Sequence, residues 1–413
     1  MLRLTILLIL SPFLLIAQNG NSPYSNFGLG EPLPDEYFHN SGMGGAGMAF
    51  PTPFHININP AFLPHNKYTT FELGGSGEYK KLTTQQNSVS DGNGSLRYLA
   101  FAFPITDKYV ISVGLRPLTN VSYNYSQSST VNGSSDTVTY NYLGEGGINS
   151  IYLSQGVQIT KNFSLGLKAA YNFGAIEKTY SSYIHNIQQA YFLESTDQTN
   201  YRGFSVAPSI GYRQQLNKNW YLNAGGAYEF GGKWGYTSTR SLVKRRLIDD
   251  APLENSTIGS DQEGKIFHPS SLRAGLSIER LYKWTLGGEV KFQDWEKFNS
   301  IDGTESLKNV STFSFGGQYV PDINAIKGYL NRTIFRLGVY YSESTFSANS
   351  EKLNDMGATL GLALPVGRLS FLNLAFAVGK RGTKETNIIE ENYFRINLGV
   401  TLNDRWFVRR KFD

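Results

Sequence analysis

The sequence predicts an all-β protein: a transmembrane antiparallel β-barrel of about fourteen strands, with an N-terminal hatch segment in its lumen. Three observations lead to this prediction. The chain begins with a secretory signal, apolar and polar residues alternate from Lys67 to the C-terminus, and short connections take turns with long ones. Together these features favour a bacterial outer-membrane protein.

The first seventeen residues have the layout of a cleavable signal peptide. Arg3 supplies an early positive charge, an apolar run extends from Leu4 to Ile16, and Ala17 is a small residue at which a signal peptidase can cut. The run is too short, and too interrupted by Pro12, to span a membrane as a helix. Cleavage near Ala17 exposes Gln18 as the first residue. Because this residue is not a cysteine, the mature chain is not predicted to be a lipoprotein. The alternative is a buried N-terminal helix.

No other run of about 18 apolar residues exists, which leaves a soluble protein or a membrane β-barrel.

Alternation is clear in three segments of the second half of the chain. In "WTLGGEVKF" every second residue from Trp284 to Phe292 is apolar or glycine, and the residues between them include Glu289 and Lys291. The segments "SLRAGLSIE" and "YFRINLGVTLN" show the same division. One face of each segment therefore suits lipid and the other suits water. Soluble β-sandwiches alternate too, so alternation alone does not decide between the two classes.

The connections between these segments fall into two length classes. Short turns are predicted at Ile105–Lys108, Thr160–Asn162, Leu216–Asn219, Arg280–Lys283 and Pro365–Arg368. Long polar connections are predicted near residues 82–95, 127–136, 248–263, 299–309, 344–353 and 380–392. Because the two classes take turns, all tight turns fall at one rim of a cylinder and all long loops at the other. Outer-membrane barrels have this arrangement, with short periplasmic turns and longer external loops.

Counting the segments gives about fourteen strands, an even number as bacterial barrels require. They are predicted near residues 68–81, 96–105, 109–126, 137–159, 163–184, 187–215, 220–247, 264–279, 284–298, 310–319, 333–343, 354–364, 369–379 and 393–408. Residues 185–187 then form an external hairpin at the tip of two very long strands. The connection from Pro321 to Arg332 is longer than the other short-side connections and is predicted to carry a helical turn.

Four of the five tryptophans are candidates for the aromatic girdles at the membrane interfaces. Trp220 and Trp284 directly follow short turns and Trp406 lies near the chain end, so these three are predicted for the periplasmic girdle. Trp234 has the same parity as Trp220 and is predicted to be its partner in the outer girdle. Trp295 has the wrong parity for lipid and is left out. Ordinary core packing is the alternative for each of them.

Residues 18–66 lack alternation and contain seven prolines. A fourteen-strand barrel, predicted here for residues 67–413, is too wide for its own side chains to fill. Residues 18–66 are therefore predicted to form an N-terminal extension and the hatch in the lumen.

This segment also contains G-x-G-x-x-G, the dinucleotide-binding fingerprint, at Gly42, Gly44 and Gly47. The fingerprint needs a buried strand before it and a helix after it. The preceding residues are polar, and Pro51 and Pro53 prevent a helix from starting at the last glycine. We therefore favour glycines that let a chain fold tightly in a narrow lumen.

The stretch "SGMGGAGMAFPTPFHININPAFL" resembles the N-terminal hatch of the FadL/TodX family of outer-membrane transporters for hydrophobic compounds. That family has a glycine-rich start followed by Asn-Pro-Ala, and the hatch residues that the resemblance implies are Gly42, Gly44, Gly45, Ala46, Gly47, Asn59, Pro60 and Ala61. The segment "HPSSLRAGLSIERLYKWTLGGEVKFQDWEKF" and the hairpins from "FRLGVYYSESTF" onward are also similar to the family. The resemblance covers nearly the whole mature chain.

Two departures from the family concern the hatch and the chain ends. The hatch lacks the acidic residues common between the glycines and Asn-Pro-Ala, so no ligand-contacting residue is carried over. The long polar lead before the glycines and the ending "RWFVRRKFD" resemble Bacteroidota members of the wider family. Some of those members are accessory barrels in secretion or outer-membrane assembly complexes.

Pro117 lies near the middle of the third predicted strand, where its missing N–H removes one hydrogen bond of the ladder. In the FadL family a kink in the third strand opens the wall sideways and lets an apolar ligand leave into the bilayer. The resemblance therefore places a lateral opening at Arg116 and Pro117. A bulge without a pore is the alternative.

Nothing in the sequence indicates an enzyme, a cofactor or a nucleic-acid partner. The five histidines at 39, 55, 65, 185 and 268 show no metal-ligand spacing, and no G-x-S-x-G is present. The absence of cysteine removes disulfides and thiol chemistry. The formal charge of +5, which loses one unit with the signal, gives no basis for nucleic-acid binding.

Two hypotheses of function remain, both with outer-membrane lipid as surroundings. The first is passive uptake of hydrophobic small molecules, long-chain fatty acids or aromatic hydrocarbons, and it predicts a continuous apolar pocket that leads to Pro117. The second is a non-transporting structural or accessory subunit of a Bacteroidota outer-membrane protein secretion or barrel-assembly complex. It predicts a sealed or polar lumen and an apolar or aromatic patch for a partner outside the lipid band.

Overall fold

The structure is a computed structural model of the chain that describes residues 22–184, 191–301, 307–345, 347–348, 351–367, 369–384 and 388–406. The predicted signal peptide and the hairpin predicted at residues 185–187 lie outside these ranges. No helix in the described ranges combines the length and the hydrophobicity that crossing a membrane requires.

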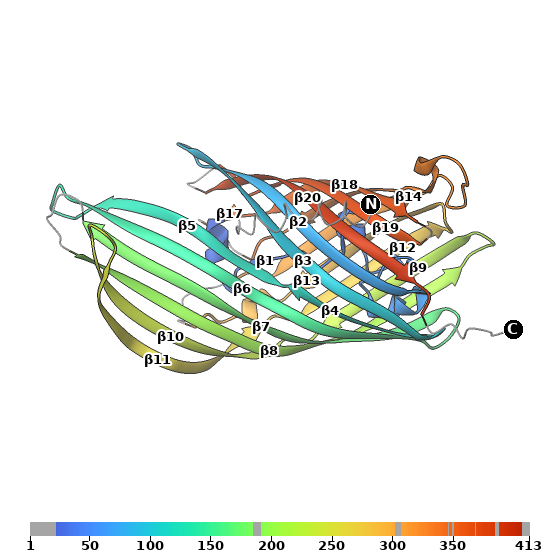
Figure 1. The fold of residues 1–413 in the computed structure, drawn as a ribbon, viewed down its shortest axis with the longest axis horizontal. Helices are drawn as coiled ribbons and strands as arrows, with labels where there is room; N and C mark the ends of the chain where they lie inside the picture. The colour runs from blue at the N-terminus through green and yellow to red at the C-terminus, as the bar shows by residue number, and fades with distance from the viewer. Residues whose placement is uncertain are drawn as a thin grey trace.

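One closed antiparallel sheet of fourteen wall strands dominates the fold (Figure 1). Its elements are β2 (Thr69–Thr83), β3 (Ser88–Thr106), β4 (Tyr109–Pro117), β5 (Thr119–Thr130), β6 (Thr137–Gln158), β7 (Phe163–Ile184), β8 (Tyr191–Gln215), β9 (Trp220–Glu229), β10 (Gly232–Arg246), β11 (Pro252–His268), β12 (Ser271–Arg280), β13 (Trp284–Gln293), β14 (Val310–Tyr319), β15 (Ile334–Ser342), β18 (Asp355–Val366), β19 (Ser370–Arg381) and β20 (Glu390–Asp404). Three wall strands consist of two consecutive elements each, namely β4 with β5, β9 with β10 and β11 with β12. Pairing of β20 with β2 closes the barrel, as predicted from the alternation together with the connection lengths.

Side chains of the wall divide between lipid and lumen as predicted. On β12, Leu276 is 61% exposed on the outer face, whereas its neighbour Arg273 is 7% exposed on the inner face. The strand pattern of exposed and buried residues alternates along β12 and β20. Lipid on one side and a packed lumen on the other explain this alternation.

The predicted short turns are correct, whereas some of the predicted long loops at the other rim are wrong. All five short turns lie between consecutive strands, and the connection from Pro321 to Arg332 carries the 3-10 helix η4 (Tyr329–Arg332). Residues 248–263, predicted as a loop, are largely strand β11, and β3 begins at Ser88 inside another predicted loop. Pro252 to Ile258 of β11 and Ser88 to Ser90 of β3 are all exposed, and this uniform exposure goes with a sequence that lacks the alternation by which a strand is identified. Figure 1 shows β5 to β8, β10 and β11 projecting beyond the other strands.

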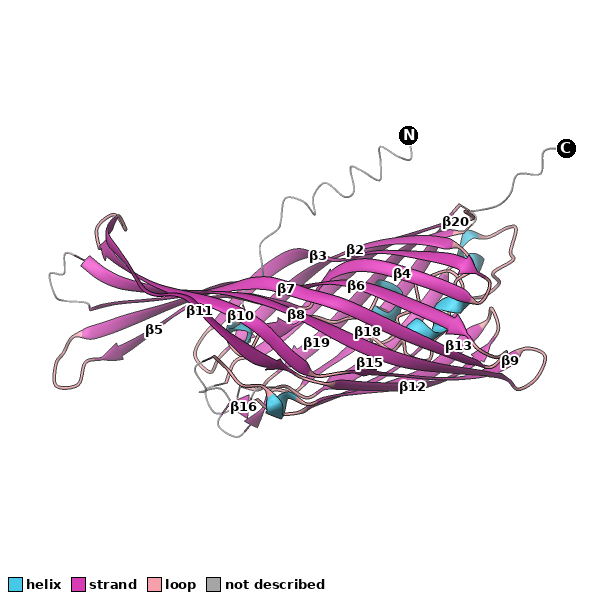
Figure 2. Ribbon diagram, turned by 90° about the horizontal axis from the view of Figure 1, so that it is seen from below, coloured by secondary structure: helices cyan, strands magenta, loops and turns pink. Residues whose placement is uncertain are grey.

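The N-terminal residues lie inside the barrel. Residues 22–66, which we name the lumen segment, contain the 3-10 helix η1 (Pro23–Asn26), the short strand β1 (Glu31–Pro32), the helix α2 (Phe38–Ser41) and the 3-10 helix η2 (Pro60–His65). In both ribbon views the wall strands surround these elements (Figures 1 and 2). Two further short pieces, the 3-10 helix η3 (Trp295–Lys297) and the hairpin of β16 (Ser347–Ala348) with β17 (Glu351–Lys352), lie in the longer connections.

Candidate functional site

The lumen segment touches the inner wall backbone to backbone at glycines of the wall strands. A Cβ atom at Gly225 would overlap the carbonyl of Met48, and one at Gly316 or Gly338 would overlap the backbone of Met43. Only glycine permits such an approach. The glycines of the wall strands therefore form the surface against which the segment is seated.

Two of the predicted hatch glycines have backbone angles that favour glycine. Gly44 and Gly45 have φ angles of +70° and +86°, which L residues rarely adopt. A Cβ on Gly44 would overlap the carbonyl of Val339. The N–H groups of Gly47 and Met48 both donate to Glu289 Oε2, at 2.8 and 2.9 Å. The remaining predicted positions, Gly42 and Ala46, are buried beside them.

The Asn-Pro-Ala triplet caps the helix η2 and ties it to the wall. Asn59 Oδ1 accepts from the N–H of Ala61 at 3.0 Å, and Pro60 occupies the first helical position, where its missing N–H costs nothing. Asn59 Nδ2 donates to the carbonyls of Met48, at 2.9 Å, and Ile210, at 3.1 Å. The amide thus joins two parts of the lumen segment to strand β8.

Several charged side chains of the lumen form ion pairs that hold the lumen segment. Arg273 binds Asp35 of the lumen segment at 2.9 Å and also pairs with Glu289. Arg116 lies 3.8 Å from the same Asp35 carboxylate. Burial alone would raise the pKa of Asp35, but Arg273 and its other basic neighbours hold it well below the usual value. A salt bridge therefore anchors this part of the segment.

A second network lies nearer the outer end of the lumen. Glu31 of β1 binds Arg381 at 2.6 Å and Lys80 at 3.2 Å. Lys80 also pairs with Glu78 at 3.1 Å, and Glu78 pairs with Arg395. These groups line a cavity of about 630 Å³ between the lumen segment and the upper wall. The cavity is thus bordered by ion pairs and is not the continuous apolar pocket that uptake of hydrophobic molecules predicts.

The apolar part of the upper lumen is closely packed. Leu29 of the lumen segment contacts a cluster that also contains Val121, Tyr123, Ile148, Ile176, Tyr201, Trp234, Ile266, Trp295, Phe298, Leu307 and Val310. A side chain of the protein itself therefore fills the place where an apolar ligand would find its best surface.

The wall is interrupted at the predicted Arg116 and Pro117. Pairing between β3 and β4 ends at Leu99 with Leu115, whereas on the other side Pro117 still pairs with Asn149 of β6. Beyond this point β5 has no pairing with β3 among the described strands, and β1 of the lumen segment pairs with β5 instead. The interruption is thus covered from inside by the lumen segment.

Three of the predicted girdle tryptophans lie at the rim of the short turns, and the fourth prediction is wrong. Trp220 and Trp284 begin β9 and β13, with their rings edge to face at 4.7 Å, and Trp406 is 54% exposed beside Phe103. Trp234 is only 1% exposed and stacks on His268 in the lumen. The break between β9 and β10 at residues 230–231 inverts the parity, so even-numbered residues face lipid before it and the lumen after it.

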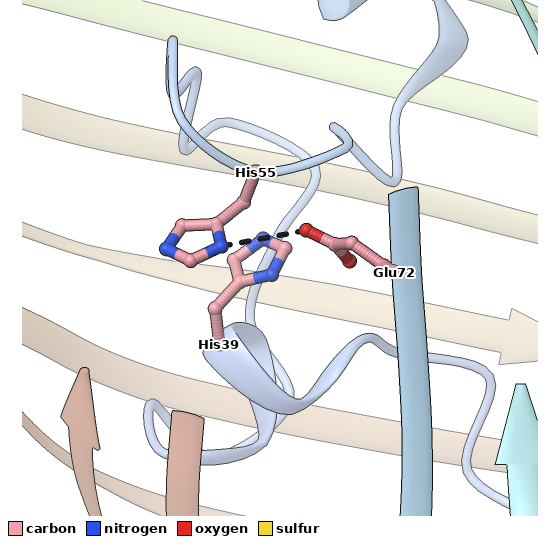
Figure 3. A group of neighbouring side chains, drawn as sticks. All are labelled: His39, His55 and Glu72. Atoms are coloured by element: carbon pink, nitrogen blue, oxygen red, sulfur yellow. Dashed lines mark ion pairs between the residues drawn. The ribbon is translucent and has the colours of Figure 1, made fainter. Parts of the chain in front are cut away.

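His39, His55 and Glu72 form a buried group between the lumen segment and strand β2 (Figure 3). Their ligand atoms lie within 4.8 Å of one another, a spacing that suggests a metal site. His55 Nε2, however, faces Arg336 at 3.4 Å and must accept its hydrogen bond, so Nδ1 carries the proton and donates to Thr401 at 3.1 Å, beside Glu72. A metal on Nδ1 would require a proton on Nε2, opposite the guanidinium. The group therefore does not fit a metal ion.

Comparison with known proteins gives one sequence family and one fold. A sequence model of BamG matches residues 1–413. The chain belongs to the BamG family. No curated protein sequence matches it.

Three similar solved structures relate the fold of this chain to the FadL/TodX barrels. The toluene transporter TodX of Pseudomonas putida is 16% identical with a TM-score of 0.60, covering 91% of this chain and 100% of its own. A FadL homologue of Pseudomonas aeruginosa is 12% identical with a TM-score of 0.58, covering 90% and 99%. The monoaromatic hydrocarbon channel CymD is 14% identical with a TM-score of 0.56, covering 92% and 99%. At these identities the likeness concerns the fold, which is that of FadL/TodX barrels of the bacterial outer membrane.

Sequence reasoning missed several residues that matter in the lumen. Arg273, Glu289 and Arg336 appear in the sequence only as polar positions of alternating strands, a pattern that marks them as lumen-facing without naming their partners. The pairing of β1 with β5 could not be predicted from the sequence either, because β1 has only two residues and shows no strand pattern.

Proposed function

We propose that this BamG-family chain is a non-transporting accessory barrel of an outer-membrane protein complex, with a lumen that its own N-terminal segment keeps closed. The observation that carries the proposal is the seating of the lumen segment through glycine contacts and the Asp35, Arg273 and Glu289 ion pairs. Membership of the BamG family supports it. We propose that this complex exports or assembles outer-membrane proteins.

The chemistry of the lumen supports closure over uptake of hydrophobic molecules. Each buried CH₂ group gains about 0.8 kcal/mol when it stays in an apolar environment. A hydrocarbon that entered this lumen would lose that gain beside paired charges such as Glu31 with Arg381. It would also have to displace Leu29 from the apolar cluster.

A second candidate function is passive uptake of fatty acids or aromatic hydrocarbons through the lumen and sideways into the bilayer. The interrupted wall at Arg116 and Pro117 favours it, as does the fold shared with channels such as TodX. On this hypothesis the predicted hatch, from Gly42 to Ala61, moves away from the wall to let the ligand pass. No cofactor or enzymatic step takes part in either function. A Bacteroidota origin remains a prediction from the chain ends.

Gentle purification from native outer membranes distinguishes the two functions. The full-length protein would be extracted in mild detergent, separated by size, and examined for stoichiometric polypeptides and bound lipid by mass spectrometry. The accessory function predicts a partner at fixed stoichiometry that retains the protein when the partner itself is tagged. A monomer that carries a stoichiometric fatty acid or hydrocarbon would support uptake instead.

A further inference from the structure

Two histidines connect the middle of the lumen segment to the wall strands. His39 lies on α2 and His55 in the chain before η2, and their rings stack at 4.5 Å with an angle of 14° between the planes. Both are almost completely buried. Phe371 of β19 covers the other side of the His55 ring at 5.4 Å. The stack therefore has no room for a water shell.

His55 lies between a basic side chain and an acidic side chain of two wall strands. Its Nε2 accepts from Arg336 of β15, and its Nδ1 lies 3.1 Å from Thr401 of β20 and 3.4 Å from Glu72 of β2. Glu72 also accepts from the N–H of Ile56 at 3.1 Å. The neutral imidazole therefore donates from Nδ1 to Thr401, beside Glu72, and accepts from the guanidinium at Nε2.

Arg336 depends on this neutral form of His55. Its other hydrogen bonds, to Asn373 and Gln318, are both 3.4 Å long, and no carboxylate pairs with it among the residues that the structure describes. A proton on Nε2 of His55 would place a donor opposite a donor and one cation beside another in a buried site. His39, stacked on the same ring, would add a third positive charge if it were protonated.

We propose that His55, with His39 stacked on it, is a proton-operated latch that holds the lumen segment while neutral and releases residues 38–58 when protonated. The titratable and charged groups that face the latch are Glu72 of β2, Arg336 of β15, the hydroxyl of Tyr98 on β3, which accepts from the N–H of Phe38, and Tyr37, whose ring stacks on His39 at 5.8 Å. Asn373 and Thr401 contribute neutral contacts. The latch goes beyond the proposed function, because either function requires a seated lumen segment.

The direction of the pH effect follows from burial. Burial lowers the pKa of both His39 and His55 well below its ordinary value, and the nearby positive charge of Arg336 lowers both further. In the released segment both rings meet water and regain a pKa of about 6.5. The seated state is therefore favoured above pH 6.5 and loses this advantage as the pH falls below it. At pH 5.5 each histidine shifts the equilibrium towards release about tenfold, so two shift it about 100-fold.

Planar-bilayer recordings of the full-length protein test the latch. We expect the ratio of its open probability at pH 5.5 to that at pH 7.5 to be about 100-fold larger than the same ratio for the double variant His39→Gln with His55→Gln. Glu72 is retained in both proteins, so this comparison isolates the two histidines. The variant His55→Gln keeps a donor and an acceptor in similar places and cannot be protonated, so its ratio should exceed that of the double variant only about tenfold.

His65→Gln is the matched control. His65 also lies on the lumen segment, and burial lowers its pKa to about 3, but it bonds the carbonyl of Phe62 on η2, outside residues 38–58. Its variant should keep the full response to acid. A pH ratio in the wild type that equals the ratio in the double variant would overturn the latch. Conductance that is already high at pH 7.5 would instead contradict the proposed closure.

A second measurement keeps the test valid if the double variant does not fold. The chain has no cysteine, so Ser41→Cys provides a single thiol on α2. Its reaction with a soluble disulfide reagent, relative to free cysteine at the same pH, should accelerate at least tenfold at pH 5.5. An unchanged ratio would also refute the latch.

Discussion

The two faces of the barrel wall differ in what they can bind. On strand β12 the outer residues Leu272 and Leu276 are exposed to the surroundings, whereas the inner Arg273 and Glu279 are buried in ion pairs. The face of β12 that suits a hydrocarbon is therefore the one that already meets lipid, whereas its inner face offers the paired charges of Arg273 and Glu279. A fold shared with hydrocarbon channels thus does not by itself imply a hydrocarbon path.

The largest expected effect concerns the ion pairs on the inner face of the wall. Arg273→Met leaves the buried Asp35 and Glu289 without their main partner. Removing one member of a buried pair costs about 3–5 kcal/mol. We expect the free energy of unfolding to fall by about that amount and the lumen segment to become sensitive to protease. Both can be measured by denaturation in detergent and by limited proteolysis.

Lys297→Met is the control for that variant. Lys297 pairs with Asp294 on the exposed surface, so its loss should leave the unfolding curve unchanged. If the two variants behaved alike, the lumen pairs would contribute no more than surface charges.

A smaller effect is expected from adding side chains to neighbouring glycines on the two faces. In Gly225→Leu the side chain points into the lumen and overlaps the backbone of Met48, whereas in Gly226→Leu it points to lipid. Overpacking typically costs about 1–3 kcal/mol, so the first variant should be destabilised and admit ions through the lumen. The second should match the wild type. Thermal unfolding and bilayer conductance would report both, and equal behaviour would refute the seating of the segment at Gly225.

The smallest effect concerns the cap of η2. Asn59→Ala removes the acceptor for the N–H of Ala61 and the donor to Met48 and Ile210. Loss of a cap costs about 0.5–2 kcal/mol. We expect a modest fall in unfolding free energy, with Asn59→Asp, which retains the acceptor, falling less. An Asp variant as weak as the Ala variant would assign the stabilisation to the Nδ2 contacts.

The wall could be predicted from the sequence because lipid and lumen impose alternation on every strand. Fourteen strands and all five short turns followed from that pattern. The pattern fails where the environment no longer alternates, as in β11, and where a break inverts parity, as before Trp234.

The candidate site was less predictable because its contacts are non-local. The glycine-rich stretch and Asn59 could be picked out by composition, but their partners lie far along the chain, at Glu289 and Ile210. Residues such as Arg336 acquire their role only when β15, β20 and the lumen segment meet. Pro117 was informative because a missing N–H is a local property with a direct effect on the sheet.

Uptake of a labelled long-chain fatty acid or of toluene by proteoliposomes at pH 7.5 tests the central claim most directly. The account predicts the same rate of entry as in protein-free liposomes, because the lumen segment closes a polar lumen. Saturable, protein-dependent entry that exceeds the protein-free rate would contradict it and would make the interruption at Pro117 a working exit.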